Sequence, residues 1–342
     1  RDWALRPFPE NTGPGGWSSI GNPGTFFRAL PTAGGGRTLL SGATPDPNCE
    51  VLGGYSSGGF CRFQYTYFDN LVEDEESIKA FGEINIDLSS GATFHAEMLY
   101  HKMDMPEWKT SPSYPPQALL GNDRLVLPTH PGLIDLKVQN PGLFPDMDIN
   151  GDGVVDIPGA FQGASTWSRM LGVAGRNGNP ESRGRFTDTR RFSAGLEGTF
   201  GDEIYYDVSV SWSQRHRDIF GSDMYIERMA FALDGLGGSG CDPATGTPGV
   251  GGCEYYNPFS NAIAVSATNG AVNPQYNPAV ANSDELIDWL TAYTGSFSDN
   301  ESLVLEAIFS GDTGIELGGG TVGWAAGLQT RKDDYDFKVL PV

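Results

Sequence analysis

The sequence lacks any run of about eighteen consecutive apolar residues, so a membrane-spanning helix is excluded. Basic residues are few: 22 Lys and Arg stand against 43 Asp and Glu, and the formal net charge is −21. Such a charge argues against nucleic acid and against an anionic membrane surface as partners, and it suits acidic loops or cation binding. A serine nucleophile elbow, an HExxH motif and a phosphate-binding loop are also missing, so nothing predicts an enzyme.

Cysteine is scarce as well, with only 4 residues. They form two pairs of equal spacing, Cys49 with Cys61 and Cys241 with Cys253, each in a segment rich in Gly, Pro and Asn. Metal sites favour ligand pairs about two to four residues apart, which these pairs do not match. Two local disulfides are the better interpretation, and they indicate an oxidising location outside the cytoplasm.

Alternation of apolar and polar residues with period two is the strongest positive signal. In residues 204–213 the even positions are Ile, Tyr, Val, Val and Trp, whereas the odd positions are Tyr, Asp and three Ser. Residues 92–101 and 191–200 alternate in the same way. Because successive side chains of a strand point to opposite faces, each segment has one apolar and one polar face. A soluble β-sandwich would bury the apolar face, whereas a membrane β-barrel would turn it toward lipid.

Connections between the predicted strands alternate between short and long. Short turns are predicted at 89–91, 201–203 and 318–320, while the other connections are long and rich in Gly and Pro. Outer-membrane barrels have short periplasmic turns and long extracellular loops, and structureless loops of such length are rare in compact soluble domains. The pattern predicts an all-β fold, an antiparallel transmembrane β-barrel that is partial, with about seven or eight strands of a larger barrel and long extracellular loops.

The expected organisation is one β-barrel portion over residues 1–342. Its predicted parts are a loop with a disulfide at 1–61, strands at 62–102, a long extracellular loop at 103–183, a hairpin at 184–218, a long extracellular loop with a disulfide at 219–300, and a hairpin at 301–336. A strand or helix is predicted at 223–234 and a short helix at 284–293. The ends of the sequence do not have the features of natural termini, and we expect an interior piece of a longer protein.

An acidic loop at 148–156 has the sequence DINGDGVVD. Alternate positions carry oxygen donors at the spacing of EF-hand-like calcium loops. The expected metal ligands are Asp148, Asn150, Asp152, the carbonyl of Val154, and Asp156. Gly159 stands where an EF-hand has a bidentate Glu, so Asp146, another carboxylate or water would complete the shell. We expect a structural Ca²⁺ that stiffens an extracellular loop; the alternative is an Asx-rich turn without an ion.

Other polar residues give weaker signals. The 4 histidines show no metal-ligand pairing, and His95 and His101 fall on the polar face of one predicted strand. They would face a lumen or contact a substrate or a metal. Basic residues at 190–191 and 215–217 would either contact an anionic substrate or balance the acidic loops. No substrate-binding residue is assigned from these patterns.

Four stretches of the chain resemble TonB-dependent outer-membrane receptors. They are CRFQYTYFDNLVEDEESIKAFGEINIDLSSGATFHAEMLYHK at 61–102, RRFSAGLEGTFGDEIYYDVSVSWSQRHRD at 190–218, FALDGLGGSGCDPATGTPGVGGCEYYNPFSNAI at 231–263 and GGGTVGWAAGLQTRKDDYD at 318–336. The resemblance implies a barrel of about 22 strands with a plugged lumen. It also implies the outer membrane of a Gram-negative bacterium and energy supplied through the TonB complex. The sequence shows no recognisable plug domain, TonB box or terminal strand ending in an aromatic residue.

Two hypotheses of function follow. The first is TonB-dependent transport, in which a scarce nutrient (siderophore, saccharide, peptide or vitamin) is bound and taken up through a plugged β-barrel without covalent chemistry. Its partners would be the TonB complex, the small-molecule or oligomeric nutrient and outer-membrane lipid, with no nucleic acid. The alternative is a secreted or cell-surface, calcium-stabilised β-sandwich that acts as an adhesin or carbohydrate-binding module. An extracellular hydrolase has little support.

Overall fold

The structure, a computed structural model, describes residues 17–33, 36–64, 72–89, 91–106, 125–168, 184–201, 203–266 and 268–340. The fold is mostly β, with antiparallel sheets. The chain divides into two compact units, each assembled from separate segments. Unit 1 comprises residues 1–71, 109–182 and 222–293, and unit 2 comprises residues 72–108, 183–221 and 294–342.

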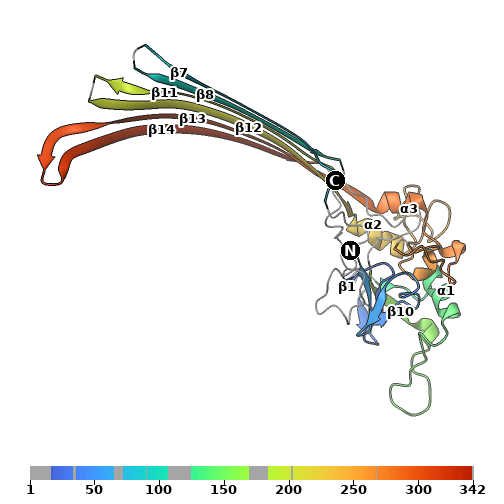
Figure 1. Cartoon of the computed structure of the whole chain (residues 1–342). Helices are drawn as coiled ribbons and strands as arrows, with labels where there is room; N and C mark the ends of the chain where they lie inside the picture. Colours follow the sequence, from blue (N-terminus) through green and yellow to red (C-terminus); the bar gives the residue numbers. More distant parts are fainter. Residues whose placement is uncertain are drawn as a thin grey trace. The chain divides into compact units, whose positions relative to one another are not determined.

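Unit 2 is built on a six-stranded sheet in the order β14-β13-β12-β11-β8-β7 (Figure 1). Its strands are β7 (Glu76–Asp87), β8 (Thr93–Met105), β11 (Arg185–Phe200), β12 (Ile204–Met224), β13 (Thr291–Leu317) and β14 (Gly320–Val339). Three hairpins with short turns therefore lie side by side, as predicted. Because neighbouring strands run in opposite directions, the three turns share one end of the sheet and the two long connections between hairpins leave from the other.

The strands of this sheet are longer than predicted. β13 has 27 residues, whereas apolar alternation predicted only 302–312. Its first part, residues 291–301, contains mostly Thr, Ser, Asp and other polar residues, so apolar periodicity does not reveal it. Pairing with a neighbouring strand holds this polar stretch extended: Ser296 is opposite Val339 and Asn300 is opposite Tyr335 on β14.

Two predictions were wrong: the number of strands in the largest sheet and the placement of the strand at 62–69. The largest sheet has six strands instead of seven or eight, and β7 and β14 are its edges, so it is not closed within the described residues. The expected strand at 62–69 is represented by β6 (Phe60–Gln64), which pairs with β1 (Trp17–Ser18) and β5 (Tyr55–Ser57) in another sheet. Gly58 and Gly59 between β5 and β6 have φ of 60° and 82° and permit this local hairpin. Residues 65–69 lie outside the described part of the chain.

Segments that were expected to be plain loops carry regular structure in unit 1. A second sheet has the order β3-β2-β10-β9, with β4 also paired to β2. Its strands are β2 (Thr25–Pro31), β3 (Arg37–Leu39), β4 (Thr44–Pro45), β9 (Leu125–Val126) and β10 (Gly163–Trp167), and the helices of the unit are α1 (Pro131–Gln139), α2 (Ile226–Leu233), α3 (Asp284–Leu290) and the short 3₁₀ helices η3 (Gly159–Phe161), η4 (Ser260–Ala262) and η5 (Pro278–Val280). No helix of the described residues is both long and apolar enough to cross a membrane.

All three segments of unit 1 contribute to one apolar core. Phe26 from β2 stacks on Phe144 with ring centroids 5.5 Å apart, and it meets Phe259 edge-on. The helices α1, α2 and α3 each bury apolar side chains in this core, including Leu133 and Leu136 of α1. Full burial of such a side chain is worth about 1.5–3 kcal/mol relative to exposure. Burial of these side chains explains why connections this long fold instead of remaining loops.

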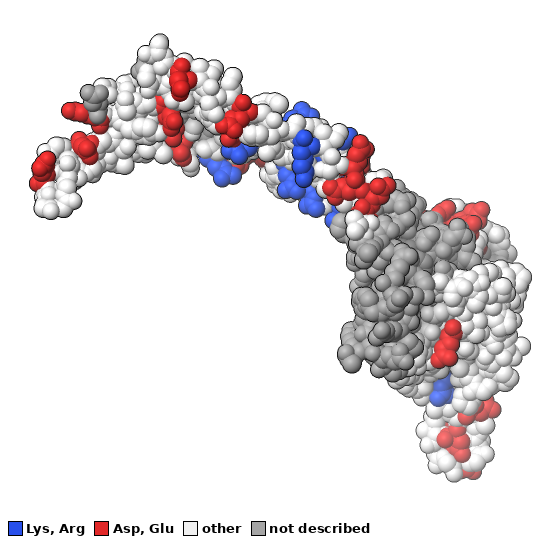
Figure 2. Space-filling view, viewed as in Figure 1, with Lys and Arg blue, Asp and Glu red and all other residues white. Residues whose placement is uncertain are grey.

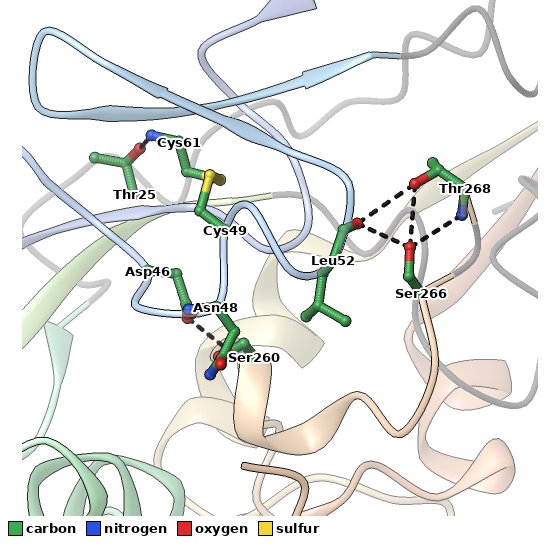
Figure 3. Close-up of a disulfide and its surroundings, with 9 residues drawn as sticks. All are labelled: Thr25, Asp46, Asn48, Cys49, Leu52, Cys61, Ser260, Ser266 and Thr268. Atoms are coloured by element: carbon green, nitrogen blue, oxygen red, sulfur yellow. Dashed lines mark hydrogen bonds between the residues drawn. A yellow bond between two sulfur atoms is a disulfide. The ribbon is translucent and has the colours of Figure 1, made fainter. Parts of the chain in front are cut away.

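Polar contacts join the first segment of unit 1 to the third (Figure 3). Both predicted disulfides are present, and Cys49–Cys61 lies next to the buried carboxylate of Asp46. That carboxylate accepts hydrogen bonds from the backbone N–H groups of Asn48 (3.0 Å) and Ser260 (2.9 Å). Burial raises the pKa of Asp46, and these bonds oppose the rise. The disulfide loop is thereby fixed to η4, some two hundred residues away in the chain.

His130 caps α1 from inside unit 1. Its side chain is 1% exposed; Nδ1 accepts a hydrogen bond from the Gly132 N–H (3.1 Å), and Nε2 lies 3.1 Å from the carbonyl oxygen of Tyr256. These partners assign the proton of the neutral ring to Nε2. Burial lowers the pKa of His130 to about 4. A second proton would have to occupy Nδ1, which faces the Gly132 N–H, so protonation breaks the cap.

We expect His130 to make folding sensitive to mild acid. The ordinary histidine pKa is 6.5 and the folded value is about 4, so the unfolded chain binds the extra proton between these values. The free energy of unfolding should be fully retained above pH 6.5 and fall by up to about 3 kcal/mol as the pH drops to 4. Chemical denaturation followed by tryptophan fluorescence measures this dependence.

The matched variant is His130→Asn, which keeps a capping side chain without a titrating ring. Its free energy of unfolding should depend less steeply on pH than that of the unmodified chain between pH 6.5 and 4. Carboxylates titrate in both proteins, so the comparison isolates the histidine. Equal slopes in the two proteins would contradict this role of His130.

Candidate functional site

One face of the six-stranded sheet is apolar over most of its area. Directly paired residues of neighbouring strands share a face, and Ile84, Ala96, Ala194 and Val210 form one continuous row across β7, β8, β11 and β12. Neighbouring rows are also apolar, for example Phe94 with Leu196 and Val208. These side chains are well exposed: Ile84 is 51% and Leu328 of β14 is 74% exposed. In the described part of the chain they face outward without a covering layer.

Aromatic residues border this apolar face at two levels. On the side of the long connections, Phe192 and Trp212 are paired across β11 and β12, with ring centroids 5.8 Å apart. On the side of the turns, Phe200 packs on Tyr206 at 4.5 Å. Outer-membrane barrels carry such aromatic girdles at both edges of their apolar band.

The height of the apolar band is also close to that of outer-membrane barrels. On β12 it runs from Ile204 to Trp212, which at ~3.3 Å per residue is about 26 Å. Strands tilted by about 40° would project this length to roughly 20 Å, close to the ~25 Å band of outer-membrane barrels. Beyond Trp212 the same face becomes charged, beginning with His216, which lies 2.8 Å from Asp218 and 2.7 Å from Asp299.

Small side chains leave a shallow hollow in the apolar face. Gly82, Ala96 and Ala194 lie at neighbouring positions, and the larger side chains of Ile84, Met98, Phe192 and Trp212 border the hollow. Its volume is about 490 Å³. An aliphatic chain would fit the surroundings of this hollow because nearly all of its lining is apolar.

The opposite face of the sheet is polar and hydrogen-bonded. His95 of β8 lies 2.6 Å from Asn85 and 3.2 Å from Glu97, and Glu97 also accepts a hydrogen bond from Ser193. Near the turns, the Tyr205 hydroxyl donates to Glu197 at 2.8 Å. The structure thus places His95 on the polar face, as predicted, within a connected polar network.

The acidic loop at 148–156 is held by hydrogen bonds between its side chains and its own backbone. Asp148 accepts from the N–H groups of Gly151 (2.7 Å) and Gly153 (2.8 Å), and the bond from Gly153 is the main cause of the lowered pKa of Asp148. Asp156 accepts from Ile149. The two glycines have φ of 74° and 86°, which a side chain would strain. Asp148 is therefore held in its charged form by the fold of the loop.

The donor set of this loop is chemically suited to calcium. Side-chain oxygens and one backbone carbonyl, without nitrogen or sulfur, are what this hard cation prefers. In the described residues no group of three His, Cys, Asp or Glu side chains converges on one point. The fit to calcium therefore rests on the sequence spacing, the loop turns and the charge of Asp148.

The basic residues of several strands combine on the polar face in a way that the periodicity of single strands does not reveal. The cross-strand register puts Lys79, His101, Thr189 and Arg215 in a single row of the polar face. These residues come from four strands and are widely spaced in the chain. Only the register, which single-strand periodicity does not supply, brings them together.

Comparison with known proteins adds no family assignment. No protein-family model matches the chain, and no curated protein matches it significantly.

Proposed function

We propose that this chain is the membrane-embedded part of an outer-membrane transporter of the TonB-dependent kind, which binds and takes up a scarce nutrient. The observation that carries the proposal is the exposed apolar face of the six-stranded sheet, bordered at two levels by aromatic residues. In this proposal the sheet is an antiparallel transmembrane portion of a larger barrel. The edge strands β7 and β14 would pair with further strands, because open edges are not tolerated in lipid.

A bilayer explains the apolar face better than a sandwich does. Exposed apolar patches beyond a few hundred Å² are rare on soluble monomers and mark a surface that something covers. A sandwich would cover the face with a second sheet packed about 10 Å away. The described residues supply no such sheet to unit 2. The secreted β-sandwich module is for this reason the weaker candidate.

The proposed mechanism is binding followed by gated passage, with no covalent step. The polar face would line the path of the nutrient, and its hydrogen-bonded side chains would offer contacts to a polar solute. Unit 1 is built from the long connections, which the barrel hypothesis places outside the cell, and its surface would take part in capturing the nutrient. Its disulfides suit an oxidising location. Energy would come through the TonB complex, as the family resemblance implies.

Calcium binding at Asp148, Asn150, Asp152, the Val154 carbonyl and Asp156 is part of the proposal. The ion would cross-link a surface loop of unit 1 and limit its motion. Such a role requires no change of conformation on binding, in contrast to a calcium sensor. An affinity in the range of extracellular modules, about 10⁻⁴–10⁻³ M, would be sufficient outside the cell.

Two lysine substitutions at neighbouring positions test the membrane assignment. Val208 lies on the apolar face and Ser209 on the polar face of β12. Val208→Lys should reduce stable insertion into phosphatidylcholine liposomes at least tenfold, because a lysine near the bilayer midplane costs about 2–4 kcal/mol. Ser209→Lys should insert like the unmodified chain. Flotation of the liposomes, followed by alkaline extraction, measures the inserted fraction.

An unmodified chain that stays soluble, or two variants with the same insertion, would contradict the membrane assignment. Transport is tested separately in cells. Growth on a limiting nutrient that depends on this protein should be lost when TonB is depleted. Growth that is unchanged by TonB depletion would contradict the energy coupling while leaving the membrane assignment in place.

Calcium binding is tested by titration of the purified protein, followed by calorimetry. The double variant Asp148→Asn with Asp152→Asn should bind calcium at least tenfold more weakly than the unmodified chain, since each substitution removes a charged ligand. Asp242→Asn is the control, because Asp242 also caps an exposed loop through Ala244 and Thr245 without the calcium spacing. Binding that is absent from the unmodified chain, or equal in the double variant and the control, would contradict the site.

A further inference from the structure

A patch of basic side chains lies on the polar face of the six-stranded sheet. It consists of Lys79, His101, Arg191, Arg215 and Arg217, and we call it the basic patch. Lys79, His101 and Arg215 belong to one cross-strand row, with Thr189 between the last two. Arg191 and Arg217 belong to the rows on either side. Figure 2 shows Lys and Arg gathered along one stretch of this sheet, with Asp and Glu on both sides.

The basic patch spans four strands and three rows. Strands are spaced by about 4.8 Å and rows by about 6.6 Å, so its width from Lys79 to Arg215 is about 14 Å and its height about 13 Å. Lys79, Arg191 and Arg215 are exposed, and Arg217 is partly exposed. A solute on the polar face would therefore meet several cations at once.

Pairing distinguishes these cations from most of the others in the sheet, including Arg331, which lies 2.8 Å from Asp333. On the apolar side, Arg190 is 3.0 Å from Asp188, and Lys332 and Lys338 each have a carboxylate within 2.7 Å two residues away. Among the described residues no carboxylate lies within ion-pair distance of the basic patch. This is unusual in a chain with 43 acidic residues against 22 basic ones.

Like charges on neighbouring strands repel each other and lower the stability of a sheet. The row next to Arg191 toward the turns carries Glu83 and Glu97, so acidic residues are near in the sheet but are absent from the patch itself. Thr187, Thr189 and Ser213 lie within the patch, and an acidic residue at any of these positions would reduce its positive charge. The arrangement therefore costs stability that a bound anion would restore.

We propose that the basic patch binds a multiply charged oxyanion, a polycarboxylate or a phosphorylated solute, and that the transported nutrient belongs to this chemical class. This inference rests on the proposed transport function, in which the polar face lines the path of the nutrient. Arginine suits the role because its planar guanidinium binds carboxylate and phosphate oxygens with two parallel hydrogen bonds. The three arginines, together with Lys79 and His101, would hold several oxygens of one solute.

The test uses the full chain in detergent at constant ionic strength, titrated in a calorimeter. The probes are citrate for polycarboxylates and pyrophosphate for phosphorylated solutes, with acetate and glucose as singly charged and neutral comparisons. The unmodified chain should bind at least one of the two polyanions and neither comparison. Stronger binding of citrate than of pyrophosphate, or the reverse, then shows whether the solute is a polycarboxylate or a phosphorylated compound. Absence of binding to both would overturn the inference.

The variant Arg215→Gln with Arg217→Gln should bind the polyanion about tenfold or more weakly, since it loses two charge-assisted contacts. Neither arginine has an acidic partner among the described residues, so their removal leaves no unpaired carboxylate. Arg190→Gln is the matched control, because it removes an arginine of the same hairpin on the opposite face. Equal weakening in the control and the double variant, or none in either, would overturn the inference.

This outcome is separable from the proposed function. A chain that inserts into liposomes but binds neither polyanion keeps the membrane assignment and overturns only the substrate class. A chain that binds the polyanion through Arg215 and Arg217 but remains soluble supports the binding site and contradicts transport. Circular dichroism of each variant confirms that the sheet is intact in these comparisons.

Discussion

In-register antiparallel pairing of six long strands is the constraint on which this structure depends. Because side chains alternate with period two, a slip of one residue between β11 and β12 would move every apolar side chain of a strand to the polar face. The observed register places Val208 opposite Leu196 and Ser209 opposite Gly195, and it continues without interruption over the whole hairpin. Both the apolar band and the basic patch exist only because this register is kept.

Unit 1 shows how long connections can fold into a compact unit instead of remaining irregular loops. Ordering a residue costs about 1–2 kcal/mol of conformational entropy, which a hydrated loop cannot offset. Here three separate segments share one core, so each buries apolar side chains that it could not bury alone. The disulfide Cys49–Cys61 and the buried Asp46 then join the first segment to η4. A surface built on this core is more rigid than free loops would be, which favours selective contact with a ligand.

Sequence patterns predicted the hairpins, the disulfides and the helix at 284–290, since each follows from local residue order, whereas 226–233 was left open between strand and helix. The sequence patterns failed where contacts between residues far apart in the chain determine the structure. The strand predicted at 62–69 pairs in unit 1 because the turn at Gly58 and Gly59 folds it back on β5. Likewise β13 extends into a polar stretch that is held by pairing with β14 and by contacts with β12 such as Phe297 with Phe220. The spacing of the acidic loop at 148–156 is evident in the sequence, whereas the basic patch depends on the register of four strands and is not.

Charged side chains are not placed at random in the six-stranded sheet: they differ between its two faces and along the length of its strands. Toward the long connections the apolar face becomes charged, yet most of its cations are paired with a nearby carboxylate, as Arg190 is with Asp188 and Lys332 with Asp334. Pairing keeps that surface close to neutral where it would meet lipid headgroups. On the polar face the five residues of the basic patch have no carboxylate within ion-pair distance among the described residues, in a chain that has abundant carboxylates. Solubility alone would favour mixed charges on both faces. Segregation of unpaired cations to one face is instead what recognition of an anion requires.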